Sequence, residues 1–267
     1  MSVTHRYAGA LDYLASDRVP PCFVHGFSTR MGGVSAGPLA SLNLGVHRGD
    51  DPENVRKNYE IFGKALGFAP EDTVFTHQIH GTEILRVTRA DRGIGLLREQ
   101  ETPCDGLITD EPGVALTVFG ADCTTILLCD PEKRVACAVH SGWRGTAAGM
   151  ARIAVERMER DHGCDPAAIV AVIGPCIGPC CFETDGDVPA AMEAALGPAV
   201  QPCIRPEGNK YYVNLKGINE LWLRSAGVGT VDVTPDCTAC RPDLYWSHRR
   251  VGNARGSLAA VLMLRPE

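Results

Sequence analysis

The sequence lacks the features that mark membrane and secreted proteins. Aromatic residues make up only 6% of the 267 residues, and LAAVLML near the C-terminus is among the longest uninterrupted apolar runs. A bilayer-spanning helix needs about 20 apolar residues. The N-terminal segment MSVTHRYAGALDYLASDR carries Asp12 and Asp17 and lacks the continuous apolar stretch of a signal peptide. We therefore expect a cytoplasmic protein with no membrane partner.

An excess of positive charge is also absent. Lys and Arg total 26 against 32 for Asp and Glu, which gives a net charge of −6. A nucleic-acid partner usually requires a basic face, so we expect none. The chain shows no linker-like segment, internal repeat or low-complexity tract. With 45% hydrophobic residues it can bury a full core, and we predict a single domain over residues 1–267, with a monomer favoured.

Hydrophobic spacing predicts a mixed α/β or α+β architecture. One helix is expected from a cap at Asp50 or Asp51 to Gly67, a second after the WRG motif and ending at Gly163, and a third over about residues 214–226. Short apolar, β-branched segments predict strands near residues 84–88, 106–109, 114–119, 125–129, 134–139, 169–173 and 258–264.

Twelve cysteines are many for a protein without a secretion signal. In a reducing compartment they act as buried hydrophobes, metal ligands or nucleophiles. Two groups could form a structural zinc site, namely the CxxC of Cys237 and Cys240 and the GPCIGPCC segment with Cys176, Cys180 and Cys181. The C-x₃-C-C spacing is irregular for zinc, so we interpret these five mainly as core or turn residues.

Three dispersed residues suit a catalytic metal. His80, Cys123 and His140 each close a segment that is typical of a strand or turn, in THQIHG, FGADCTT and AVHSGWRG. Two imidazoles and one thiolate are a zinc ligand set that leaves a fourth position for water or substrate. His77 lies three residues before His80, but the flanking residues indicate a turn, so only one is expected to ligate and we choose His80. Taken alone, a cysteine in the position of Cys123 is more often a core thiol than a metal ligand or nucleophile.

Two glycine-containing segments are candidate substrate-binding loops. The turn after His140 contains Ser141 and Gly142 and enters a helix, where backbone N–H groups and Arg144 suit phosphate or a developing negative charge. A structural salt bridge for Arg144 is the alternative. FSTRMGGVSAGPLASLNLG offers Arg30, Ser41 and Asn43, although a plain surface turn would also fit. Neither segment matches a Walker or dinucleotide motif.

These motifs together closely resemble the bacterial laccase-domain family, once called polyphenol oxidases. The resemblance rests on GFSTRMGGVSAGP, SLNLG, QIHG, DGLIT, GADC, HSGWRG and IGPCIGPCCFE, which occur in order from about residue 22 to the C-terminal SHRR segment. It implies a β-sandwich core flanked by helices and metal ligands at His80, Cys123 and His140. It also implies purine nucleoside phosphorylase activity on adenosine, inosine and methylthioadenosine, with adenosine deaminase activity at the same site. Ser141, Phe182 and His248 depart from the commonest pattern, which leaves the substrate preference open.

The implied substrates suggest roles for the candidate residues. Phosphate is assigned to Arg144, the helix start at Gly142 with neighbouring Ser141, and Arg30. Asn43 and His77 are assigned to the base or ribose. Asp122 is the candidate acid for deamination, or else it holds a ligand histidine. The expected cofactor is Zn²⁺, and copper would accept the same ligands.

Two other functions use the same residues. Cys123 could be a nucleophile activated by His140, with the SGWRG amides as an oxyanion hole, in a cysteine hydrolase or amidase. A binding protein that keeps a metal for stability is the third possibility. The eight histidines include no His-x-His pair, which argues against a four-copper laccase, and the H-x-E and P-C-x-x-C motifs of cytidine-type deaminases are absent.

Overall fold

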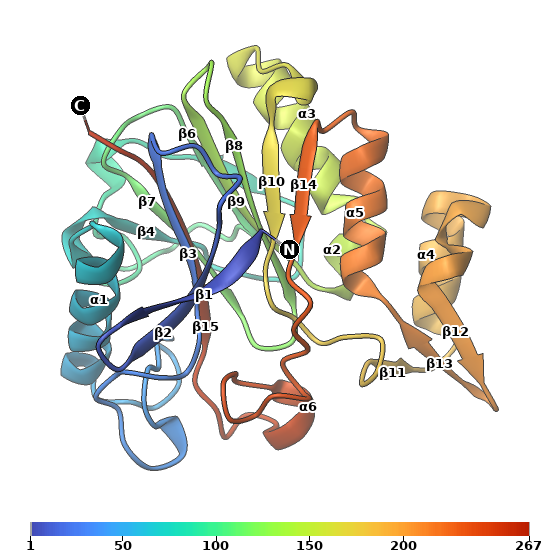
Figure 1. Cartoon of the computed structure of the whole chain (residues 1–267), viewed down its shortest axis with the longest axis horizontal. Helices are drawn as coiled ribbons and strands as arrows, with labels where there is room; N and C mark the ends of the chain where they lie inside the picture. Colours follow the sequence, from blue (N-terminus) through green and yellow to red (C-terminus); the bar gives the residue numbers. More distant parts are fainter. Residues whose placement is uncertain (1, 267) are drawn as a thin grey trace.

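Two six-stranded sheets lie face to face in the computed structural model, which describes residues 2–266 (Figure 1). The first, sheet I, has the order β1 (Val3–Ala8), β2 (Leu11–Ser16), β3 (Phe23–Ser28), β15 (Leu258–Leu264), β7 (Ala115–Gly120) and β4 (Thr73–Phe75). Sheet II has the order β14 (Thr230–Val233), β10 (Val170–Ile173), β8 (Thr124–Asp130), β9 (Val135–Ser141), β6 (Gly106–Thr109) and β5 (Ile84–Arg86). A small third sheet pairs β11 (Glu183–Thr184), β13 (Lys210–Val213) and β12 (Ile204–Glu207).

Residue alternation along the central strands explains the layering. In β15, Leu258, Ala260, Leu262 and Leu264 join the core between the two sheets, whereas Ala259, Val261 and Met263 join the core beneath helix α1 (Pro52–Leu66). β9 alternates in the same way between the inter-sheet core and the core beneath the helices of sheet II. Both faces of these strands are therefore buried, which explains their continuous apolar sequences.

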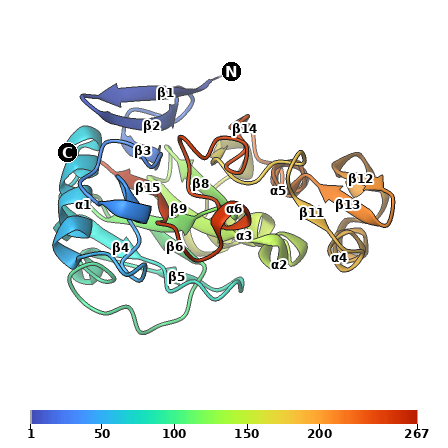
Figure 2. The same cartoon turned by 90° about the horizontal axis from the view of Figure 1, so that it is seen from below.

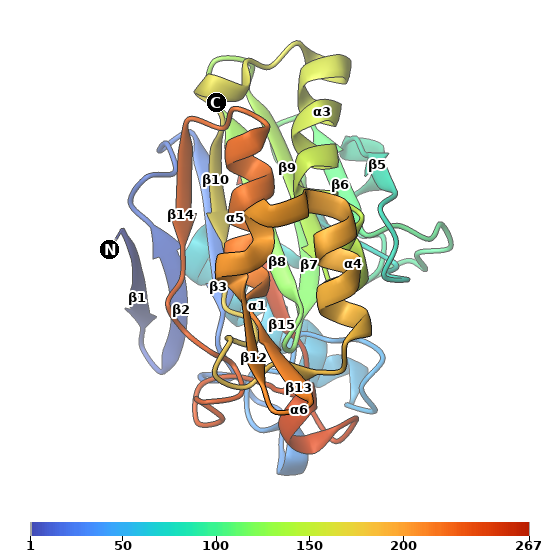
Figure 3. The ribbon, with the colours of Figure 1, turned by 90° about the vertical axis from the view of Figure 1, so that its right-hand side faces the viewer.

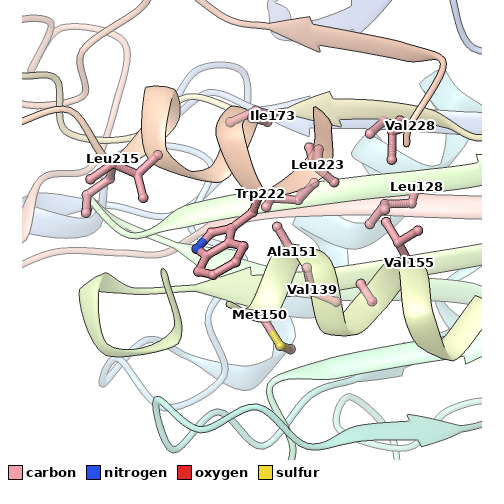
Figure 4. Close-up of a cluster of buried hydrophobic side chains, with 14 of the residues drawn as sticks. Leu128, Val139, Met150, Ala151, Val155, Ile173, Leu215, Trp222, Leu223 and Val228 are labelled. Carbon is pink, nitrogen blue, oxygen red and sulfur yellow. The ribbon is translucent and has the colours of Figure 1, made fainter. Parts of the chain in front are cut away.

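Helices cover the two outer faces. α1 lies against sheet I, while α3 (Met150–His162) and α5 (Leu215–Ser225) both lie against sheet II. α1 is therefore on the opposite side of the molecule from α3 and α5 (Figure 2). The close-up in Figure 4 shows Trp222 and Leu223 of α5 beside Met150, Ala151 and Val155 of α3. α4 (Asp187–Leu196) stands beside the small sheet, outside the main sandwich, and α6 (His248–Val251) is a single turn (Figure 3).

The predicted architecture, a mixed α/β single domain with a β-sandwich core flanked by helices, is confirmed. The seven predicted strands occur within two residues of their expected bounds. The first helix is capped at Asp51, one of its two expected caps, and the third helix begins directly after Asn214, near its expected start. Each of these side chains accepts a backbone N–H of the first turn. The second is divided into α2 (Trp143–Ala147) and α3, because Gly149 adopts a left-handed conformation between them. No helix in residues 2–266 is long and apolar enough to cross a membrane.

Candidate active site

The strand order brings four chain segments to one end of sheet II. β9 runs antiparallel to both β8 and β6, so its end lies beside the starts of its two neighbours. His140 is near the end of β9, Cys123 directly precedes β8, and Asp105 directly precedes β6. β5 is parallel to β6, so the loop before it, which carries His80, reaches the same end.

His80, Cys123 and His140 form a possible metal site. One ligand atom from each residue lies within 4.8 Å of the others, and the two imidazole rings meet edge to face at a centroid distance of 4.9 Å. His140 is buried, Cys123 is half-buried and His80 is exposed. This donor set suits Zn²⁺ with one position left for another ligand, and the exposure of His80 opens the site to solvent on that side.

Asp105 organises the site, and its importance was not recognised from sequence. Its carboxylate is fully buried and accepts a hydrogen bond from His140 Nδ1 at 2.7 Å. It also accepts the backbone N–H groups of Ile79, His80 and Gly81 at 3.1, 3.0 and 2.7 Å. Because Nδ1 of His140 is held by Asp105, Nε2 is left to face the other ligands. One carboxylate therefore fixes two of the three ligand residues.

The electrostatics of the pair favour a charged hydrogen bond. Burial raises the pKa of Asp105, but the hydrogen bonds from His140 and Gly81 outweigh it and leave that pKa lowered. Burial lowers the pKa of His140, but Asp105 and Cys123 outweigh it and raise that pKa to about 9. The pKa of His80 is lowered by burial and by the neighbouring His140, which favours the neutral imidazole that binds metals.

Unusual backbone conformations occur at the same place. His80 and Asp122 have positive φ angles of 60° and 93°, which residues with a side chain rarely adopt. A Cβ atom at Gly142 would lie 2.8 Å from His80 Nδ1 and 3.3 Å from Cys123 Sγ. Only glycine fits between the two ligand residues at that position. Backbone strain of this kind is concentrated at functional sites.

Asp122 connects the site to the C-terminal part of the chain. Its carboxylate accepts hydrogen bonds from Thr238 Oγ1 at 2.6 Å, Ser247 Oγ at 3.0 Å and the Arg249 backbone N–H at 2.6 Å. It is Asp105, rather than Asp122, that binds a ligand histidine. The proposed role of Asp122 as an acid stays a prediction.

Arg255, which lies near Cys123, and its neighbour Arg48 were not recognised from sequence. Arg255 is 9% exposed, and its buried Nε has no hydrogen-bond partner within residues 2–266. Burial and the neighbouring Arg48 lower its pKa to about 10, against the attraction of Asp122 and Cys123. Arg48 Nε donates to Ser257 Oγ at 3.0 Å. Two adjacent cations with a free buried donor are suited to an anion. Their sequence contexts, GVHRGD and NARGS, contain no recognised phosphate-binding motif, so the sequence offered no reason to choose these arginines as anion ligands.

The other predicted site residues are placed around this centre. Arg144 is exposed, stacks on the Trp143 ring at 4.2 Å, and contributes to the lowered pKa of His80, so it lies at the rim. Ser141 is buried and bonds to Thr146 and Asn219. α2 is only five residues long, which weakens the dipole argument for phosphate at Gly142.

Arg30, Asn43 and His77 have their polar groups engaged within the protein. The Arg30 guanidinium donates to the carbonyls of Ala40 and Pro242 and lies 3.9 Å from the Trp246 ring centroid. The buried Asn43 side chain bridges Gly45, Asp50 and Ser257. His77 Nδ1 meets the Gln100 carbonyl at 3.1 Å, apart from the three ligand residues. The roles of these three in substrate binding stay predictions.

Residues 24–265 match the family model described as "Multi-copper polyphenol oxidoreductase laccase". The chain belongs to this family. It is 38% identical over 249 residues to "Purine nucleoside phosphorylase YlmD" of Geobacillus stearothermophilus, with 91% of each protein covered. A "Purine nucleoside phosphorylase" of Deinococcus radiodurans is 39% identical over 240 residues, covering 90% of this chain and 88% of that protein.

Solved structures agree with the fold. The crystal structure of the Bacillus licheniformis hypothetical protein YfiH superposes with a TM-score of 0.92 at 32% identity, covering 98% of this chain and 99% of that one. That of YlmD from Geobacillus stearothermophilus gives a TM-score of 0.85 at 35% identity, covering 98% of both chains. The resemblance identified from the motifs is confirmed at the level of the family and the fold.

Proposed function

We propose that this protein is a zinc-dependent purine nucleoside phosphorylase that acts on adenosine, inosine and methylthioadenosine and also deaminates adenosine. The observation that carries the proposal is the convergence of His80, Cys123 and His140 beside the Arg48–Arg255 pair. A donor set for a catalytic metal and an anion-binding pair at one site suit a reaction between a nucleoside and phosphate. The names of the relatives support purine nucleosides as the class of substrate.

In phosphorolysis, a phosphate oxygen attacks C1′ of the nucleoside while the C1′–N9 bond breaks and the purine leaves with the bonding electrons. Phosphate held by Arg255 and Arg48, with Arg144 at the rim, would face the positive charge that develops on the ribose. The base or ribose stays assigned to His77 and Asn43, as expected from the sequence. A proton must reach the leaving purine, and the exposed face at His80 admits solvent to supply it.

In deamination, water replaces the 6-amino group of adenine and ammonia leaves. His80, Cys123 and His140 would hold a zinc ion, which would supply the Lewis acidity needed to activate water as the nucleophile. Asp105 keeps His140 in the tautomer that leaves Nε2 free. Asp122, adjacent to Cys123, is the proposed proton donor for the leaving ammonia.

Product analysis tests the proposal directly. The purified protein is assayed by chromatography on adenosine and inosine, with and without phosphate, and its metals are measured by elemental analysis. Free base that appears only with phosphate supports phosphorolysis, and phosphate-independent inosine from adenosine supports deamination. If Cys123→Ala and His140→Ala purify folded and metal-free yet keep full activity on both nucleosides, the zinc mechanism is wrong.

A cysteine hydrolase is the second candidate, because His140 is hydrogen-bonded to Cys123 on one side and to Asp105 on the other. In a catalytic triad, a base lies between the nucleophile and a carboxylate that orients the base, and His140 would be that base here. Alkylation separates the two functions. A nucleophilic Cys123 reacts fast in metal-free protein and its loss abolishes amidase activity, whereas a zinc thiolate is protected when zinc is bound.

A further inference from the structure

Four cysteines outside the active site converge on one point. Cys180 and Cys181 belong to the turn after β10, and Cys237 and Cys240 belong to the segment after β14. Their four sulfur atoms lie within 4.8 Å of one another, and Cys240 Sγ is 3.4 Å from the sulfurs of both Cys180 and Cys181. Four thiolates at about 2.3 Å from a tetrahedral zinc ion would be about 3.8 Å apart, so the observed spacing fits that geometry.

We propose that Cys180, Cys181, Cys237 and Cys240 form a structural tetrathiolate zinc site, separate from the His80–Cys123–His140 site. The two sites share no ligand. The irregular C-x₃-C-C spacing, which made zinc unconvincing from sequence, is resolved because Cys176 is not part of the cluster. Cys176 is instead buried, and the adjacent pair Cys180 and Cys181 supplies two ligands.

The backbone holds the two cysteine turns together before any metal is considered. Cys176 and Cys237 form an isolated parallel β-bridge, and the Thr238 N–H donates to the Cys176 carbonyl at 3.1 Å. In the other turn, the N–H groups of Cys181 and Phe182 both donate to the Gly178 carbonyl. The sulfurs are therefore positioned by hydrogen bonds rather than by chance contact of flexible loops.

Hydrogen-bond donors and two arginines lie around the four cysteines. The Gly178 N–H donates to Cys237 Sγ at 3.1 Å, and a Cβ at Gly178 would lie 3.1 Å from Cys237 Cβ and 3.2 Å from Cys180 Sγ. Arg249 donates to the carbonyls of Cys181 and Glu183, and Arg250 donates to the carbonyl of Ala239. Four thiolates and Zn²⁺ carry a net charge of −2, which these two guanidinium groups would offset.

The same segments form one wall of the active site. Thr238, between Cys237 and Cys240, binds Asp122 Oδ1, and the Arg249 backbone binds Asp122 Oδ2. The Ile177 N–H donates to the Asp122 carbonyl at 3.0 Å. Zinc at the four cysteines would therefore fix the chain around Asp122, next to Cys123, without touching substrate.

Metal counting tests this site independently of the proposed activity. Untagged full-length protein is purified and its zinc measured by elemental analysis. We expect two zinc ions per chain in the unaltered protein and one in the double variant Cys180→Ser/Cys240→Ser, which alters the two exposed cysteines of the cluster. Cys22→Ser and Cys203→Ser, at two half-buried cysteines outside the cluster, are matched controls and should keep both ions.

A second measurement covers the case in which the double variant fails to fold. Cobalt is substituted for zinc in the Cys123→Ala/His140→Ala variant, which leaves the four-cysteine cluster intact. An absorption spectrum typical of tetrahedral cobalt with four thiolate ligands supports the site. One metal ion per chain that is lost with Cys123 and His140, or a disulfide between Cys240 and Cys180 or Cys181 in protein isolated without air, would overturn it.

Discussion

At the scale of single residues, Asp105 determines the geometry of the candidate active site. It binds one ligand side chain and the backbone on both sides of another, so its effect reaches beyond one hydrogen bond. The sequence made the ligands recognisable because imidazole and thiolate are uncommon and chemically specific. A carboxylate that orients them looks like any other aspartate at the start of a strand, and only the pairing of β6 with β9 shows its role.

Asp105→Asn should lower both metal affinity and activity by about 10- to 100-fold, the usual effect of removing a carboxylate that orients a ligand histidine. Asparagine keeps an acceptor for one hydrogen bond but loses the negative charge opposite His140. The check is zinc affinity by competition with a chelator, together with kcat/KM on a nucleoside. Asp110→Asn, at the other end of β6, is the matched control because Asp110 pairs with Arg86 near the surface. Equal effects from both variants would contradict this role for Asp105.

Arg255→Met should raise the KM for phosphate by about 10-fold or more, since a hydrogen bond to a charged group contributes about 1.5 to 3 kcal/mol. Methionine preserves much of the side-chain length and removes the cation beside Cys123. Steady-state kinetics at varied phosphate provide the measurement. Arg265→Met, at an exposed arginine that bonds to the Pro21 carbonyl, should leave that KM unchanged. An unchanged KM for phosphate in Arg255→Met would show that phosphate does not bind at Arg255, and Arg144 would be the next candidate.

At the scale of elements, burial explains why some strands were predicted and some were missed. β8, β9 and β15 are buried on both faces, so their sequences are continuous apolar runs that stand out. β1 is an edge strand that is mostly exposed, and β14 is half-buried throughout, so neither shows a strong pattern. The division of α2 from α3 depends on the conformation of Gly149, which periodicity does not register.

Strands β2 and β3 are joined partly by a side chain. Their backbone register covers two residue pairs, and beyond it the Ser16 N–H donates to His25 Nε2 at 2.8 Å. Burial and the nearby Arg6 lower the pKa of His25 to about 4, below the ordinary value near 6.5. The neutral imidazole is therefore the native form.

Stability should fall as the pH drops from about 6.5 to 4. The unfolded chain takes up a proton at His25 in this range and the folded protein does not, so up to about 3 kcal/mol is lost. Chemical denaturation at a series of pH values measures the slope. His25→Gln retains an acceptor for the Ser16 N–H and should flatten this part of the profile, and His47→Gln, at an exposed histidine, should not. If the free energy of unfolding of His25→Gln still falls with pH in this range, the pH dependence belongs to another titrating group.

The contact between α5 and α2 is a second test at this scale. Trp222, labelled in Figure 4, is 7% exposed. Its indole Nε1 donates to the Thr146 carbonyl at 2.8 Å, just before the break at Gly149. Trp222→Phe removes this hydrogen bond, although the Thr146 carbonyl keeps the one from the Gly149 N–H, and it also reduces packing. The free energy of unfolding should therefore fall by about 1 to 3 kcal/mol. Tyr7→Phe, at an exposed aromatic residue, should change it by less than about 0.5 kcal/mol. Urea denaturation compares the two, and similar losses would show that the Thr146 contact is not responsible.

At the scale of the whole molecule, the family description names a multicopper oxidase, but the residues of this chain argue for different chemistry. A trinuclear copper centre requires several His-x-His pairs, and the eight histidines of the sequence contain none. The described structure gathers two histidines with one cysteine instead. The cytoplasmic location and the monomer that we favour stay predictions.

Copper-loaded protein should therefore show no laccase activity on phenols above that of the metal-free protein. Copper can occupy the His80–Cys123–His140 ligands, but a single site of this kind cannot pass four electrons to oxygen. Oxygen consumption with a phenolic substrate is the measurement, with a true laccase as positive control. Sustained oxygen reduction to water by the copper-loaded protein would restore the oxidase interpretation.

The central position of β15 has a consequence for biosynthesis. This strand follows β3 and β7 in the sequence, yet it lies between them, with Ala260 paired to Phe27 across more than two hundred residues of chain. Sheet I therefore stays open in the middle until β15 has been synthesised, and pairings of such long range are slow to form. The earlier strands of this sheet can complete their pairing only after residues 258–264 have been added to the growing chain.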